Sequence, residues 1–301
     1  MAKAGRDATA IGIAAVLAGV CAMSLNDMLV KFLSGGFPLH QIVLVRAGIG
    51  ILVTLVLIRA EGGPVVLATR QPLLHAMRGA LVICANMSFF AALVAMPLAE
   101  TTALYFVAPL LMALFAVPLL GERLDPFRLG AILVGLAGVA VVLRPGGELF
   151  RPVAALPLLS AVFYALMQIL TRRIGATEKA SAMAFYTQLS FLLFSAAFGL
   201  AFGDGHLRFP GNPSVDFLFR PWIWPRGQDA LLLLLLGINS AAVGYLMSQA
   251  YRLANVAVIA PFEYAAMPLA VMWGFVVFRD WPDQVALAGI GLILAAGLFT
   301  G

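Results

Sequence analysis

Charged residues are scarce in this sequence. Only 11% of its 301 residues are Asp, Glu, Lys or Arg, whereas soluble domains contain about 25%. A soluble protein of this length needs a polar surface, so the scarcity excludes that class. The hydrophobic content of 62% and the mean hydropathy of +1.00 instead predict an all-α integral membrane protein, with the lipid bilayer as its surroundings.

Cysteine is also scarce, and the usual motifs of enzymes and pumps are missing. Cys21 and Cys84 lie in apolar runs, and we expect buried free thiols without a disulfide. The sequence contains no HExxH, no GxGD, no paired aspartate motif and no phosphate-binding GxxxxGK loop. It therefore predicts no enzyme activity, no cofactor, no metal site and no ATP-driven pumping.

The basic residues are better explained by membrane topology than by nucleic acid. The net charge is +5, and Lys and Arg gather on cytoplasmic loops when a membrane protein inserts. With the N-terminus inside, the loops on the cytoplasmic side hold more of these residues than the loops on the outer side. We therefore predict that both termini are cytoplasmic and that the protein does not bind nucleic acid.

The hydropathy pattern predicts ten membrane-spanning helices. About 20 apolar residues cross a hydrocarbon core of about 30 Å, and turns rich in Gly and Pro separate the apolar runs. The connection at 203–228 is much longer than the others, and its Trp and Arg residues predict a loop among the lipid headgroups rather than a lid. The expected spans are 9–32, 39–58, 73–95, 98–120, 127–143, 153–171, 181–202, 229–250, 256–278 and 284–300.

The chain has an internal repeat. A shift of 158 residues sets the fourth and fifth spans on the ninth and tenth, with Glu122 over Asp280 and Asp125 over Asp283, which we expect to cap helices. A shift of 141 sets the first span on the sixth. Because each half has an odd number of helices, five, the second half enters the membrane in the opposite orientation. Many secondary transporters are built from such inverted repeats. We predict two inverted five-helix repeats, 1–146 and 147–301.

Three segments resemble a known family. They are LLGERLD at 119–125, APFEY at 260–264, and NDMLVKFL at 26–33 with VRAG at 45–48. These resemble the ten-helix, EamA-type members of the drug/metabolite transporter superfamily, although the second copy of the acidic turn has Arg279-Asp280 in place of Gly121-Glu122. The resemblance implies a bacterial inner-membrane carrier of amino acids or related metabolites, and among these it is most similar to the aromatic amino-acid exporters.

The candidate site residues are charges that should not lie in lipid, because such charges face the bundle interior or water. Glu263 lies deep in the ninth span, two residues after Pro261. It is either a carboxylate that titrates a proton or binds an amine, or a partner for a buried arginine. Arg46 in the second span either holds a substrate carboxylate or pairs with Glu263 or Asp27. Tyr105, the repeat mate of Glu263, is expected across the same cavity.

Other polar residues inside the spans predict a moderately polar cavity, although each alone is more often a contact between helices than a ligand. Asp27 and Lys31 have the spacing of a local ion pair. The remaining candidates are Asn26, Asn86, Gln168, Gln188, Asn239, Tyr245 and Gln249.

Gating candidates are prolines and a basic pair. Pro109, Pro261 and Pro268 interrupt the fourth and ninth spans, where freed backbone groups line cavities. His75 and Arg78 stand one turn apart at the start of the third span, either as an interfacial pair or as part of a gate.

The sequence as a whole predicts a secondary transporter, a monomer or homodimer, that exports amino acids by alternating access through a cavity between the repeats. The alternatives are uptake of another small metabolite, or a channel.

Overall fold

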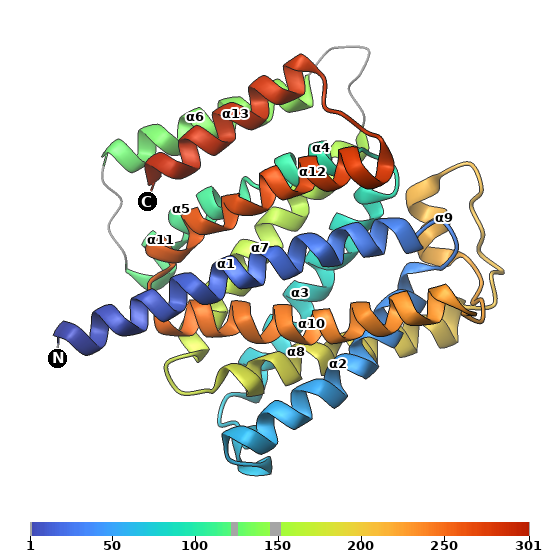
Figure 1. The fold of residues 1–301 in the computed structure, drawn as a ribbon, viewed down its shortest axis with the longest axis horizontal. Helices are drawn as coiled ribbons and strands as arrows, with labels where there is room; N and C mark the ends of the chain where they lie inside the picture. The colour runs from blue at the N-terminus through green and yellow to red at the C-terminus, as the bar shows by residue number, and fades with distance from the viewer. Residues whose placement is uncertain (1, 122–125, 145–151, 301) are drawn as a thin grey trace.

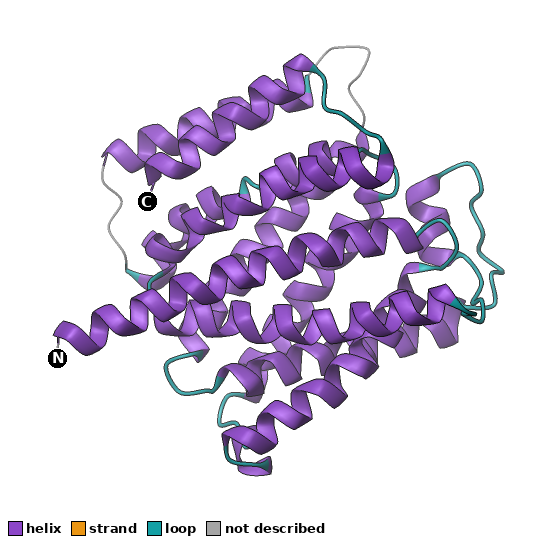
Figure 2. Cartoon of the chain, in the orientation of Figure 1, coloured by secondary structure: helices purple, strands orange, loops and turns teal. Residues whose placement is uncertain are grey.

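The computed structural model describes residues 2–121, 126–144 and 152–300, which form a bundle of helices (Figures 1 and 2). Three short 3₁₀ helices accompany them: η1 (Pro64–Leu67), η2 (Pro152–Ala154) and η3 (Ala260–Ala265). The α-helices are α1 (Ala2–Leu33), α2 (Leu39–Glu61), α3 (Pro72–Leu93), α4 (Leu98–Tyr105), α5 (Ala108–Leu120), α6 (Pro126–Leu143), α7 (Ala155–Ile174), α8 (Ala180–Phe202), α9 (Pro213–Phe219), α10 (Gln228–Leu253), α11 (Val256–Ile259), α12 (Ala266–Phe278) and α13 (Gln284–Thr300).

Several of these helices, alone or joined end to end, are long and apolar enough to cross a membrane. In the described part of the chain, eight helical segments meet that requirement, and two shorter apolar helices, Leu129–Leu143 and Gln284–Gly297, accompany them. These segments fall on the ten ranges that the hydropathy pattern predicts. The prediction of an all-α, multi-pass membrane protein is therefore confirmed.

The fourth and ninth spans are broken in the middle. The fourth consists of α4 and α5, and Pro109 lies in the first turn of α5. The ninth consists of α11, η3 and α12, and Pro261 lies in the first turn of η3. Proline fits a first turn because the N–H that it lacks would have no helical partner there. The two breaks meet, since the rings of Phe106 and Tyr264 lie 5.5 Å apart. Pro268 is exposed, outside the break.

Helices α6 and α13 pack side by side along one edge of the bundle (Figure 1). Glycine allows this close contact. A methyl group on Gly138 would lie 2.9 Å from the carbonyl oxygen of Gly289, and a methyl group on Gly289 would lie 2.9 Å from the carbonyl oxygen of Gly138. By contrast, a methyl group on Gly130 or Gly291 would have no neighbour within 4 Å. The described parts of the two halves therefore meet at a seam that tolerates almost no added volume.

The long connection between α8 and α10 is more ordered than a plain loop, and its position among lipid headgroups stays a prediction. It contains α9, whose Phe217 side chain is fully buried. Arg220 donates a hydrogen bond to the Ser34 carbonyl oxygen (2.9 Å), and the Gln41 side chain accepts one from the Ile223 N–H (3.0 Å). The connection is therefore packed onto the adjoining ends of α1 and α2.

Three smaller expectations have different outcomes. Cys21 and Cys84 are exposed, not buried, because an apolar thiol is stable on the lipid-facing side of a helix. Asp283 accepts a hydrogen bond from the Ala286 N–H (2.8 Å) and so caps α13 as expected; its hydrogen bond from Arg144 holds the pKa of this carboxyl below its usual range. Glu122, Asp125 and the boundary between 146 and 147 lie outside the described residues.

Candidate functional site

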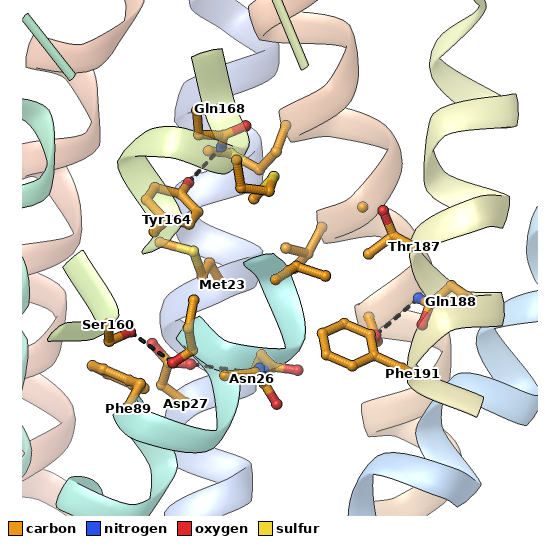
Figure 3. A pocket seen from close by; sticks show the side chains of 18 of the residues that line it. Met23, Asn26, Asp27, Phe89, Ser160, Tyr164, Gln168, Thr187, Gln188 and Phe191 are labelled. Carbon is orange, nitrogen blue, oxygen red and sulfur yellow. Dashed lines mark hydrogen bonds between the residues drawn. The ribbon is translucent and has the colours of Figure 1, made fainter. Parts of the chain in front are cut away.

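A cavity of about 850 Å³, counting its open mouth, lies between α1, α2, α3, α4, α7, α8 and α10. Figure 3 shows polar side chains of α1, α7 and α8 pointing into this space. Eight of the residues singled out from the sequence line it: Asn26, Asp27, Arg46, Arg78, Asn86, Tyr105, Gln168 and Gln188.

Arg46 on α2 is held rigidly in the cavity wall. Its guanidinium group donates hydrogen bonds to the side-chain oxygens of Asn26 (3.3 Å) and Asn86 (2.9 Å). The group lies between two aromatic rings, 5.5 Å from the centroid of Phe90 and 5.0 Å from that of Phe191. These cation–π contacts stabilise a charge that has left water. The Arg46 Nε atom is buried and has no hydrogen-bond partner among the described residues.

The expected ion pairs of Arg46 and Asp27 are not found. In the described part of the chain, Arg46 forms no ion pair with Asp27 or Glu263, and Asp27 forms none with Lys31. Asp27 instead accepts a hydrogen bond from the Asn26 amide (3.3 Å) and faces the cavity. Lys31 points away and donates to the carbonyl oxygens of Leu93 (3.0 Å) and Met96 (2.6 Å) at the end of α3. Lysine side chains can hydrogen-bond the free carbonyls at a helix end, and Lys31 does so in place of a pair with Asp27.

Arg78 does not lie in an interfacial pair with His75. Its side chain is buried, and it donates to Thr171 on α7 (2.7 Å), to Thr187 on α8 (2.7 Å) and to Ser248 on α10 (3.2 Å). It also donates to a carbonyl oxygen of α8. His75 stacks on the ring of Tyr186 at 4.3 Å. Arg78 therefore joins four helices at one end of the cavity.

Glu263 lies behind the cavity wall. Its side chain is fully buried in η3, and its Oε1 atom accepts hydrogen bonds from the hydroxyl groups of Tyr164 (3.0 Å) and Tyr251 (2.6 Å). Tyr164 lines the cavity, and its hydroxyl also accepts a hydrogen bond from Gln168 (2.7 Å) (Figure 3). Tyr105 packs against Tyr164 with ring centroids 5.3 Å apart. Glu263 and its repeat mate Tyr105 thus lie on either side of Tyr164.

The sequence reasoning missed the aromatic and small polar parts of the wall. Tyr164 could have been found, because it precedes Gln168 by one helical turn and must share its face. The phenylalanines and methionines carried no signal, since such residues occur throughout membrane helices. The missed lining residues that matter most for the chemistry are Phe89, Phe90, Ser160, Tyr164, Thr187, Phe191, Ser240 and Ser248.

Three candidates lie elsewhere. Tyr245 donates a hydrogen bond to Glu61 (3.0 Å) near the end of α2, and Gln249 does not line the cavity. Asn239 donates to the Ala22 carbonyl oxygen (2.7 Å) and so ties α10 to α1. Among the described residues, no group of His, Cys, Asp and Glu could hold a metal ion.

A multi-pass helical bundle with a central polar cavity is typical of a small-molecule transporter, and comparisons with known proteins support this class rather than an enzyme. Residues 10–144 match the EamA-like transporter family. A solved crystal structure shares the fold, with a TM-score of 0.70 and 24% identity over 98% of this chain and 97% of that chain.

Three relatives span most of the chain. An S-adenosylmethionine uptake transporter of Rickettsia prowazekii is 23% identical, covering 96% of this chain and 91% of the relative. A riboflavin transporter of Rhizobium johnstonii is 28% identical, with 94% and 88% covered. A pseudopaline exporter of Pseudomonas aeruginosa is 26% identical, with 91% and 89% covered. The chain is thus similar to drug/metabolite-type carriers of small molecules, and these relatives do not support the predicted similarity to aromatic amino-acid exporters.

Proposed function

We propose that the protein is a secondary carrier that takes up a small metabolite combining a flat heteroaromatic ring with charged groups, as S-adenosylmethionine does. The observation that carries this proposal is the cavity, where one carboxylate and a rigid guanidinium group share a wall with aromatic rings. The relatives named for S-adenosylmethionine uptake and for riboflavin support a metabolite with a flat heteroaromatic ring, and the former also supports charged groups on it. Uptake therefore replaces export as the proposed direction.

The cavity offers a partner for each part of such a substrate. Arg46 would hold a carboxylate, because it lines the cavity and a guanidinium group can donate paired hydrogen bonds to a carboxylate. Asp27 would hold a cationic group, and it faces the same space. The rings of Phe89 and Tyr105, 5.1 Å apart, would pack against a flat base. The substrate would then replace the water that solvates both charges.

The proposed architecture is two inverted five-helix repeats with both termini in the cytoplasm of a bacterial inner membrane. In support, α5 and α12 are offset by 158 residues at both ends, as the sequence repeat predicts. The start of α1 and the end of α13 lie toward the same end of the bundle (Figure 1). Facing breaks near the middle of two related spans provide hinges for alternating access.

Riboflavin is a second candidate. It carries no charge, but its ring edge alternates hydrogen-bond donors and acceptors. The cavity matches that pattern with four amide side chains, Asn26, Asn86, Gln168 and Gln188.

Ligand-induced stabilisation of the purified protein tests the substrate class, because a ligand that binds only the folded state raises the unfolding temperature. S-adenosylmethionine should raise it in wild type and not in Arg46→Ala. A response to riboflavin that survives in Arg46→Ala would favour the second candidate. A response to phenylalanine alone, or to none of the three compounds, would reject the proposed substrate class.

A further inference from the structure

The Glu263 carboxyl lacks any group that could stabilise a negative charge fully. In the described part of the chain it forms no ion pair with Lys, Arg or His. Its Oε1 atom accepts two phenol hydrogens, while its Oε2 atom is buried without a partner. An ionised carboxylate without a cation is very costly away from water. A neutral acid, with its proton on Oε2, leaves only one donor unpaired and costs much less.

Among the side chains that the structure describes, the elements packed against η3 add no compensating charge. Helices α5, α11, α12 and α13 contain no charged residue at all. On α1, Asp27 and Lys31 are committed to Asn26, Leu93 and Met96. The titratable groups nearest to the carboxyl are therefore phenols: Tyr164 on α7, Tyr251 on α10, Tyr264 beside it in the chain, and Tyr105 on α4 across Tyr164.

Only one side chain separates this acid from the cavity. The Tyr164 hydroxyl contacts Glu263 on one side, and the Tyr164 side chain lines the cavity on the other. Glu263 itself lies in η3, the 3₁₀ break of the ninth span, where a change in helical geometry would move the carboxyl.

We propose that Glu263 is a proton-binding site that is reached from the substrate cavity through Tyr164 and that couples proton movement to uptake. The proton comes from water in the cavity, binds the carboxylate and returns to water on the other side, so no bond to the substrate forms or breaks. The coupling half of this proposal rests on the proposed transport function, whereas the proton site does not.

Infrared spectroscopy of the purified protein tests the proton site without any substrate. Wild type at neutral pH should show the C=O stretch of a protonated carboxylic acid that Glu263→Gln lacks and that the control Asp27→Asn retains. Tyr251→Phe and Tyr164→Phe each remove one hydroxyl from the same oxygen, but only Tyr164 faces the cavity. Proton–deuterium exchange of the acid should therefore slow in Tyr164→Phe and not in Tyr251→Phe.

Transport in proteoliposomes tests the coupling. Gln mimics the neutral acid, so Glu263→Gln should keep substrate exchange and lose the accumulation that a pH gradient drives in wild type. Absence of the C=O band would overturn the proton site, and accumulation by Glu263→Gln equal to wild type would overturn the coupling. If wild type exchanges no S-adenosylmethionine or riboflavin, the proposed function fails, and the band alone then decides whether the proton site exists.

Discussion

The two halves of the chain contribute different chemistry to one cavity. All three charged side chains of its wall, Asp27, Arg46 and Arg78, come from the first half, on α1, α2 and α3. The second half, on α7, α8 and α10, contributes neutral amides and hydroxyls to the wall. The carboxyl group of Glu263, which also belongs to the second half, is buried behind Tyr164.

The same contrast holds where the broken spans meet. The fourth span has Tyr105 at the end of α4, and the ninth has Glu263 in η3, at the position that the sequence repeat predicts to match it. Under the proposed function, Tyr105 would face the substrate, and Glu263 would lie behind Tyr164. The first half would then recognise charge on the substrate, whereas the second half would hold the group that couples to protons.

The largest expected effect comes from the contact between the halves. Among the described residues, the hydrogen-bond acceptors of Arg78 all lie on helices of the second half, whereas those of Arg46 are Asn26 and Asn86 of the first. Hydrogen bonds to a charged group contribute about 1.5–3 kcal/mol each, so Arg78→Ala should lose at least about 3 kcal/mol of stability. Thermal unfolding in detergent measures this. If Arg46→Ala destabilises the protein more than Arg78→Ala does, Arg78 is not the link between the halves.

Substrate affinity should depend most on the first half. Arg46→Ala removes a charged hydrogen bond, so affinity should fall roughly 10- to 100-fold. Arg46→Lys keeps the charge but loses the planar fork and its stacking between two rings, and it should recover little. Gln188→Ala removes a neutral lining group of the second half and is the matched control. Isothermal titration of the three variants would contradict the division if Gln188→Ala lost as much affinity as Arg46→Ala.

A smaller effect is expected at the α6–α13 seam, where the halves are equivalent. A methyl group on Gly138 would meet the carbonyl oxygen of Gly289, so Gly138→Ala should cost about 1–3 kcal/mol through overpacking. Gly291→Ala adds the same methyl group to α13 with no neighbour within 4 Å and should cost nothing. Unfolding temperatures of the two variants test the seam, and equal losses would show that helix packing is looser there than described.

The smallest effect is expected in the long connection between α8 and α10, which lies in the second half of the chain. Burial would raise the pKa of Asp216, but hydrogen bonds from Arg208 and Arg220 outweigh it and hold the pKa below its usual range. Because the pKa of Asp216 is lower in the folded state, its ionised carboxylate stabilises α9 at pH values above the ordinary aspartate pKa of about 3.9. This stabilisation is lost as the pH falls through the lower, folded-state pKa.

Hydrogen exchange of residues 213–220 measures this contribution, which should be about 1 kcal/mol or less. Asp216→Asn should exchange faster than wild type at neutral pH, and the difference should vanish in strong acid. Asp204→Asn, in the same connection but paired only with the nearby His206, should behave like wild type. Unchanged exchange in Asp216→Asn would mean that the contacts of Asp216 with Arg208 and Arg220 do not hold α9 in place.

The sequence predicted the helices and the breaks because these depend on local signals. Apolar runs of membrane-spanning length and prolines in the first turn of a segment are visible without a structure. Polar residues in apolar runs also identified eight lining residues of the cavity.

The sequence could not predict partners across the bundle. The spacing of Asp27 and Lys31 suggested a local pair, but the free carbonyls at the end of α3 are nearer in space. Arg78 lies close to a helix end in the sequence, which suggested the membrane interface, but three other helices surround it. Tyr164 and the rings around Arg46 depend on how α2, α3, α7 and α8 pack, which no local pattern encodes.

Counterflow in proteoliposomes tests the central claim most directly. Vesicles containing the purified protein would be loaded with unlabelled S-adenosylmethionine, and entry of the labelled compound followed at a low outside concentration. A carrier that alternates between two openings should accumulate label transiently above its equilibrium level, saturate with substrate, and lose this overshoot in Arg46→Ala. Entry that rises in proportion to concentration, without overshoot, would show a channel and contradict the account.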